Sequence, residues 1–205
     1  QFVKFKIVVG TAGKWIRLFQ VVGDDGTYII NCIQLKKTIA AADTGAITIN
    51  DNAIATPFPS VKFIEGMAGV ITSIKVNIFG YHHTSPDDVD MCLQGPDGTH
   101  VMLMSDCGGG LPGIVAPINF VLDDSGADPD LPDAAAFPAG TYKTKDYNVL
   151  SGEMGVSGSP PGPHSPNLLS FLGKQPNGAW KLFVLDDSAV DVGAISNWTL
   201  TITAA

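Results

Sequence analysis

The sequence predicts an all-β protein, a mostly antiparallel β-sandwich of the jelly-roll type with a strand-rich N-terminal extension. Short segments of alternating apolar and polar residues recur along the 205 residues, and turns rich in the 23 Gly and 14 Pro separate them. Eighteen of the 20 acidic residues are Asp, which suits turns, whereas Glu favours helices. Both observations indicate many strands and little helix.

The first 55 residues are predicted to form the extension, which either adds to the sandwich or makes a small separate β unit. Alternating patterns predict strands at residues 2–9, 15–22, 27–35 and 46–49. The motif Thr56-Pro57-Phe58-Pro59 then interrupts the pattern, because proline fixes its own backbone and lacks an amide donor. We therefore place the domain boundary between residues 55 and 56.

Residues 56–205 are predicted to form the sandwich. One strand face is expected to carry Val70, Thr72, Ile74, Val76 and Ile78. Later strands are expected at residues 180–184 and 198–202, where Trp180 and Trp198 are predicted core anchors. The stretch 151–167 is rich in Gly, Ser and Pro and predicts a long exposed loop.

The loop Pro96-Asp97-Gly98 predicts a hairpin, because Gly98 can adopt the positive φ that a three-residue turn requires. Alternating apolar residues flank this loop on both sides. Facing them toward one core pairs Leu93 with Val101 and Met91 with Leu103. The opposite register would turn His100 inward and is disfavoured.

The same register sets Asp88 opposite Asp106 at the end of the hairpin. Opposed carboxylates repel, and a cation between them would turn the repulsion into coordination. Ca²⁺ prefers oxygen ligands of this kind. The sequence therefore predicts a calcium site built from several loops, although solvated turn carboxylates are the competing interpretation. The candidate ligands are Asp87, Asp88, Asp90, Asp106, Asp123 and Asp124. Asp186 and Asp187, together with Asp191, form a second candidate cluster.

Charge is distributed unevenly along the chain. Residues 1–50 contain six Lys/Arg and three Asp, whereas residues 51–205 contain six Lys/Arg and seventeen Asp/Glu. The acidic part is expected to repel nucleic acid and anionic membranes and to attract cations. No apolar run reaches the length of a membrane-spanning helix. The start at Gln1 favours a processed N-terminus, and we expect a secreted, extracellular protein.

Catalytic motifs are missing from the sequence. No Gly-x-Ser-x-Gly motif occurs, and the four His are scattered, so His83 is expected to serve as a structural hydrogen-bonding residue. Cys32, Cys92 and Cys107 cannot all pair, and they lack zinc-site spacing. Cys92 is expected on the polar face of its strand, without an activating base nearby. The run Gly108-Gly109-Gly110 has no following helix and predicts a turn rather than a phosphate loop.

The order of motifs resembles the P domain of proprotein convertases, most closely the version found in secreted bacterial proteins. The resemblance begins with the run Tyr81-His82-His83-Thr84 and the segment 87–99. It continues through residues 103–106, 120–124, 137–142, 169–171, 177–182, 186–187 and 193–200. The resemblance as a whole covers about residues 56–203. Two departures are residues 1–55, which match no part of the pattern, and the cysteines at 92 and 107.

The resemblance implies an eight-stranded jelly roll without catalytic machinery, in a family associated with Ca²⁺. Our first hypothesis is a non-catalytic extracellular module, stabilised by calcium, that serves assembly, adhesion or the support of a protein partner. The second is an accessory domain of a secreted subtilisin-like protease. The third is a self-assembling surface or virion protein, in which the N-terminal strand pairs with a neighbouring chain.

Overall fold

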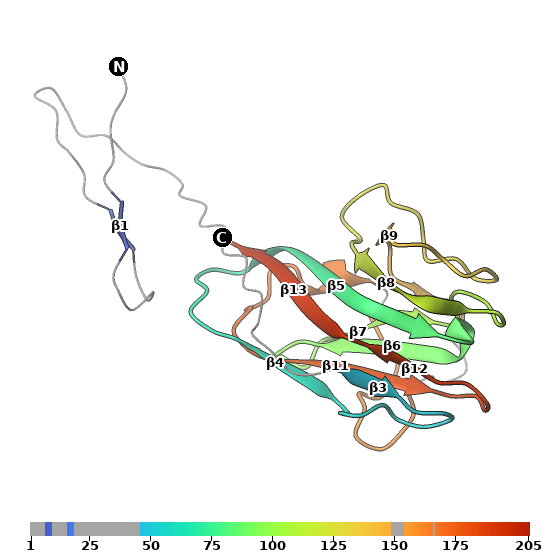
Figure 1. Cartoon of the computed structure of the whole chain (residues 1–205). Coiled ribbons are helices and arrows are strands. Elements are labelled where there is room, and N and C mark those ends of the chain that lie inside the picture. Colours follow the sequence, from blue (N-terminus) through green and yellow to red (C-terminus); the bar gives the residue numbers. More distant parts are fainter. Residues whose placement is uncertain (1–6, 10–15, 19–45, 149–153, 166) are drawn as a thin grey trace, which may run out of the picture. The chain divides into compact units, whose positions relative to one another are not determined.

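The computed structural model describes residues 7–9, 16–18, 46–148, 154–165 and 167–205. The chain divides into two compact units, Gln1–Gln34 and Leu35–Ala205. In the first unit, β1 (Ile7–Val9) and β2 (Ile16–Leu18) form an antiparallel two-stranded sheet (Figure 1). The strand predicted at residues 27–35 lies outside the described residues.

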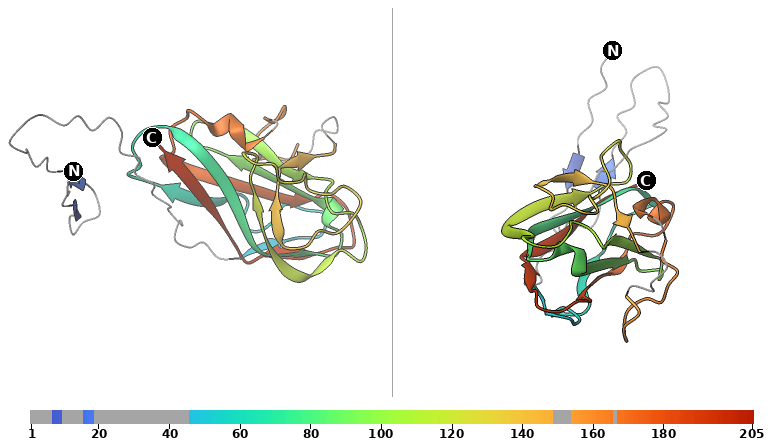
Figure 2. Two further views of the ribbon diagram at one scale, coloured as in Figure 1. Left: turned by 90° about the horizontal axis from the view of Figure 1, so that it is seen from above. Right: turned by 90° about the vertical axis from the view of Figure 1, so that its right-hand side faces the viewer.

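The second unit contains two sheets that pack face to face (Figure 1 and Figure 2). The β11 sheet has the order β10-β7-β6-β11-β4. Its strands are β4 (Ser60–Ile64), β6 (Val89–Gln94), β7 (His100–Ser105), β10 (Lys145–Asp146) and β11 (Gly178–Asp186).

The β5 sheet has the order β3-β12-β5-β8-β9, and β13 also pairs with β5. Its strands are β3 (Ile47–Ile49), β5 (Ile71–His83), β8 (Ile114–Leu122), β9 (Gly140–Tyr142), β12 (Gly193–Ile195) and β13 (Asn197–Ala204). Two short 3₁₀ helices, η1 (Pro86–Asp88) and η2 (Leu168–Phe171), are the helical elements among the described residues. The predicted all-β sandwich is confirmed, and its jelly-roll connectivity stays a prediction.

Antiparallel pairing dominates both sheets, as expected. The exceptions are the parallel contacts of β10 with β7 and of β8 with β9. β3, which falls within the predicted extension, pairs with β12 and adds a strand to the β5 sheet. Its residues Ile47 and Ile49 are fully buried, so this short strand is part of the sandwich core.

Two tryptophans anchor the core between the sheets, as predicted. Trp180 of β11 and Trp198 of β13 are fully buried. The indole N–H of Trp180 donates to the carbonyl of Pro176 at 2.8 Å, and that of Trp198 donates to the Ser60 hydroxyl at 2.9 Å. Each large ring therefore buries its apolar area without leaving its polar atom unsatisfied.

The predicted apolar face of β5 is correct at its centre and wrong at its start. Ile74, Val76 and Ile78 are buried, but Thr72 is exposed and Ile71 is buried in its place. A register shift between β5 and β13 at this point explains the difference. A shift of one residue moves side chains to the other face of a strand.

The β6–β7 hairpin confirms part of the predicted register. Leu93 pairs with Val101, and Gly98 has a φ of 88°. The pairing of Met91 with Leu103 is wrong, because Met91 pairs with Met104 across a register shift. This bulge lets Leu103 and Met104 both be buried. This register does not set Asp88 directly opposite Asp106.

The face of β6 that was expected to be polar is instead covered. Cys92 is fully buried in a second small apolar cluster with Met102, Met154, Phe183 and Leu185. Met154 belongs to the stretch predicted as an exposed loop, so that prediction is wrong for this residue. Both described cysteines, Cys92 and Cys107, are free, and burial first of all raises the pKa of each thiol to about 12.

Candidate functional site

Five chain segments meet at one end of the sandwich, and we call this end the acidic rim. The segments are residues 51–54, 83–90, 106–115, 132–135 and 186–192. His83, the last residue of β5, pairs with Gly193 of β12 on one side and with Ile114 of β8 on the other. The amide of Asp187 donates to the carbonyl of Asp88 at 3.0 Å, which extends the β11–β6 pairing into the loops at this end.

Backbone hydrogen bonds bring the remaining loops to the same rim. The amide of Asp87 donates to the carbonyl of Gly109 at 3.3 Å, and the amide of Gly108 donates to the carbonyl of Pro132 at 2.8 Å. Gly108 and Gly109 both have positive φ values, 92° and 63°. The predicted turn in the Gly108–Gly110 run is thus confirmed, because glycine adopts this conformation without steric cost.

A buried histidine–aspartate pair lies beneath the rim. Nε2 of His83 is 3.0 Å from Oδ2 of Asp186, and both side chains are fully buried. Nδ1 of His83 is 2.8 Å from the carbonyl oxygen of Ser85 and 3.3 Å from the amide nitrogen of the same residue. The contact through the other nitrogen joins β5 of one sheet to β11 of the other.

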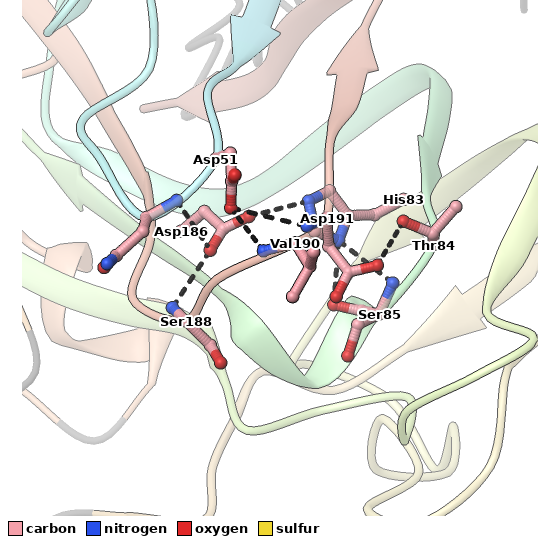
Figure 3. Close-up of polar contacts among 9 residues, drawn as sticks. Asp51, His83, Thr84, Ser85, Asp186, Ser188, Val190 and Asp191 are labelled. Atoms are coloured by element: carbon pink, nitrogen blue, oxygen red, sulfur yellow. Dashed lines mark hydrogen bonds and ion pairs between the residues drawn. The ribbon is translucent and has the colours of Figure 1, made fainter.

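Asp186 is held by the loops on both sides of it (Figure 3). Its Oδ1 accepts from the amide of Ser188 at 3.0 Å and from that of Asn52 at 3.4 Å. Burial raises the pKa of Asp186, while these amides and His83 counteract the rise, and the net shift is upward. The expected structural role of His83 agrees with this geometry, since its ring is enclosed by backbone and carboxylate.

Asp51 shapes the exposed loop between β11 and β12. Its Oδ1 accepts from the amide of Val190 at 2.7 Å and from that of Asp191 at 3.4 Å (Figure 3). The hydroxyl of Thr84 in turn donates to Oδ1 of Asp191 at 2.5 Å. Sequence reasoning missed Asp51, which lies two residues after the strand predicted at 46–49. Its partner lies 139 residues away, and no local pattern reveals such a contact.

Carboxylates crowd each other at this rim. Burial raises the pKa of Asp87, and Asp106, Asp88 and Asp133 raise it further. Burial also raises the pKa of Asp88; the Ser85 hydroxyl opposes this, and Asp191, within hydrogen-bonding reach, adds to it. Asp106 thus lies close enough to act on Asp87. These groups hold their negative charges against mutual repulsion.

The other predicted ligands are divided between the rim and the rest of the fold. Asp187 lies at the rim, and the nearly fully buried Asp90 lies in β6 opposite Leu185. Asp123 and Asp124 follow the far end of β8, where Asp123 contacts Lys75 at 2.5 Å. Asp124 accepts hydrogen bonds from Thr144 and from the amide of Leu168. The structure does not bring this last pair to the rim.

The rim offers oxygens for a cation but no preformed cage of side chains. Within the described ranges, no three His, Cys, Asp or Glu side chains are arranged as a metal centre. The nearest approach to one is the contact between Asp88 and Asp191. Two carboxylates this close fit a shared proton or a shared cation.

A comparison with known protein families matches one part of this chain. The sequence model of the proprotein convertase P-domain matches residues 163–202, which include η2, β11, β12 and most of β13. The predicted resemblance to the P domain is therefore confirmed, and this match carries it. The P domain is a non-catalytic accessory domain family. No curated protein matches the chain.

Two solved structures from Aeromonas sobria show a weaker likeness. One is its serine protease in complex with a chaperone, with a TM-score of 0.39 and 14% identity over 84% of this chain. The other is the serine protease of the same organism, with a TM-score of 0.38 and 12% identity over 98% of this chain. The matches span only 27% and 36% of those chains. In the part of this protein that the structure describes, no helix is long and apolar enough to cross a membrane.

Proposed function

We propose that this protein is a non-catalytic extracellular β-sandwich module that supports a protein partner, as an accessory domain of a secreted serine protease. The observation that carries the proposal is the P-domain match over residues 163–202, within a two-sheet sandwich. Accessory domains of this family stabilise the domain they accompany rather than perform chemistry, and an extracellular location goes with that role.

The chemistry of the described residues supports a non-catalytic role. His83 has the carboxylate that a catalytic histidine needs, but it is fully buried, and its second nitrogen faces the carbonyl of Ser85 instead of a hydroxyl. A nucleophile–base pair requires a hydroxyl or thiol within reach of that nitrogen and access for substrate. Cys92 contacts His164 at 3.7 Å, but it is buried and its thiol stays protonated.

We further infer that Ca²⁺ binds at the acidic rim and stabilises the module. Asp88 and Asp191 are the residues that would hold the ion, with Asp87 and Asp106 close by. A bound divalent cation would supply positive charge where these carboxylates repel one another. Ca²⁺ accepts six to eight oxygens, so backbone carbonyls and water would complete its shell.

A fluorophosphonate probe, which labels active serine hydrolases covalently, tests the proposed partnership. The isolated chain should not be labelled and should not hydrolyse peptide or ester substrates. The native protein from its source, isolated under mild conditions, should contain the sandwich together with a labelled serine protease, in the same polypeptide or in a stable complex. A native form that carries no labelled species would contradict the proposal.

A second candidate function is self-assembly through the N-terminal strand. Within the described residues, β1 has β2 as its one neighbour, in a sheet of two strands. Such a sheet is only marginally stable in water, so pairing with a strand of another copy would stabilise it. Sedimentation velocity should then reveal concentration-dependent assembly that disappears when residues 1–12 are deleted. A chain that stays monomeric at all concentrations would exclude this function.

A further inference from the structure

The acidic rim is rich in negatively charged side chains. Its five segments contain nine Asp and no Lys or Arg. The nine are Asp51, Asp87, Asp88, Asp90, Asp106, Asp133, Asp186, Asp187 and Asp191. Asp186 is compensated by His83, but Asp51 and Asp187 are exposed, and Asp87, Asp88 and Asp191 are half-buried. A surface with one sign of charge attracts partners of the opposite sign and speeds their association.

Large apolar side chains are exposed on the same rim. Of the eleven such residues in the described chain, five lie in its segments. They are Ile54, Leu111, Val115, Val190 and Val192, with exposed fractions of 42%, 80%, 67%, 90% and 60%. Val192 and Val115 each adjoin a residue that pairs with His83, so they flank the end of β5 on its two sides. Exposed apolar side chains that gather in one region mark interaction sites.

Val190 is also held in a strained conformation. Its φ is 84°, a left-handed value that β-branched residues rarely adopt, and its side chain is 90% exposed. No packing of that side chain offsets the strain. The carboxylate of Asp51, which accepts from the Val190 amide, fixes the loop in this form. Strain retained without a packing benefit points to a function for the presented side chain.

We propose that the acidic rim is the docking surface for a basic protein face, one that presents Lys or Arg around aliphatic side chains. This inference rests on the proposed function, because it names the surface through which the module supports its partner. Nucleic acid and anionic membranes are repelled by the rim. Calcium held by Asp88 and Asp191 would use part of the carboxylates of the rim, but it would not contact exposed apolar side chains such as Val190 and Leu111. A basic protein face would pair its Lys or Arg with the rim carboxylates and pack its aliphatic side chains against the exposed apolar residues.

Isothermal titration with short synthetic peptides tests the proposal. The probe is a peptide in which Lys and Leu alternate with Gly, and its two controls replace every Lys by Glu or every Leu by Ser. The intact chain should bind the Lys/Leu peptide, lose this binding in high salt, and bind both controls at least about tenfold more weakly. Equal binding of all three peptides would overturn the proposal.

Matched variants locate the binding. The rim variant Asp87→Asn/Val190→Ser should bind the Lys/Leu peptide about tenfold more weakly than the parent, whereas Asp128→Asn/Val156→Ser, away from the rim, should bind it unchanged. Melting curves of both variants verify folding, since all four side chains lie at least partly in solvent. Equal losses in the two variants, or none in the first, would refute the surface.

Two further outcomes separate the alternatives. Self-association of the chain that the rim variant abolishes would identify a second copy as the occupant and overturn the proposed partner chemistry. Absence of peptide binding together with fluorophosphonate labelling of the native protein would refute the rim while leaving the accessory function intact. Peptide binding at the rim without a labelled protease would support the docking surface and refute the accessory function.

Discussion

The two ends of the sandwich use the same residue type in opposite ways. At the far end, Asp97 contacts Lys174 at 2.8 Å and Asp123 contacts Lys75 at 2.5 Å. Burial alone would raise the pKa of both carboxyl groups, but hydrogen bonds from Lys, Thr or Ser make the net shift downward. At the acidic rim, burial and neighbouring carboxylates raise the pKa of Asp87 instead.

The direction of the pKa shift distinguishes carboxylates that stabilise the fold from carboxylates that do not. A carboxyl group whose pKa is lowered by folding stabilises the folded state at neutral pH, and one whose pKa is raised destabilises it. The far end therefore uses Asp for stability. The rim keeps charged residues that lower the stability of the fold. Such residues are expected where a surface serves binding, because functional sites often depart from what stability alone would favour.

The largest expected effect concerns the buried pair of His83 and Asp186. Replacing Asp186 by Ala leaves a buried imidazole without its partner and should lower the free energy of unfolding by about 3 kcal/mol. Urea denaturation at neutral pH measures this change. The control is Asp187→Ala, next in sequence but exposed, which should cost much less. Equal losses at the two positions would show that the pair does not join the sheets as described.

Calcium should act at one end of the sandwich only. Adding Ca²⁺ at about one hundred times its dissociation constant should stabilise the protein by about 2.7 kcal/mol, and EDTA should remove this gain. Thermal melting with and without the ion reports the effect. Asp88→Ala should blunt the response, and Asp106→Ala should reduce it, while Asp97→Ala at the far end should keep it in full. Identical melting with Ca²⁺ and EDTA would eliminate the calcium proposal.

Local patterns predicted more of the strands than of the rim. The alternation in β13 and the positive φ of Gly98 are local properties, so they could be predicted from neighbouring residues. The bulge between Met91 and Cys92 could not, because it depends on which side chains the opposite sheet buries. The Asp clusters of residues 87–90 and 186–191 were expected to be separate. They meet because β6 and β11 are neighbours, a pairing between distant segments that local sequence does not encode.

Relief of strain at Val190 should have a smaller effect. Val190→Gly removes the side chain that opposes a φ of 84° and should raise the free energy of unfolding by about 0.5–1 kcal/mol, after the added flexibility of the unfolded chain is counted. Val192→Gly, in the same loop but without a positive φ, should lower it slightly. Chemical denaturation of both variants distinguishes the two signs. A loss of stability in Val190→Gly would mean that its side chain makes a stabilising contact.

The smallest effect is also the most direct test of the contrast between the two ends. Because folding raises the pKa of Asp87 above its ordinary value of 3.8, its destabilising contribution is absent in acid and grows as the pH rises through the folded pKa. Asp87→Asn should therefore stabilise the protein by about 0.5 kcal/mol near neutral pH and have no effect at about pH 3.

Asp97 should respond with the opposite sign. Its lowered pKa gives stability that is present above 3.8 and is lost as the pH falls through the folded pKa. Asp97→Asn should then destabilise the protein near neutral pH by a similar small amount and lose its effect in acid. Urea titrations of both variants across this pH range measure the two signs in one experiment. If both substitutions shift stability in the same direction, the carboxylates at the two ends are equivalent. The contrast between the ends would then no longer support a binding surface at the rim.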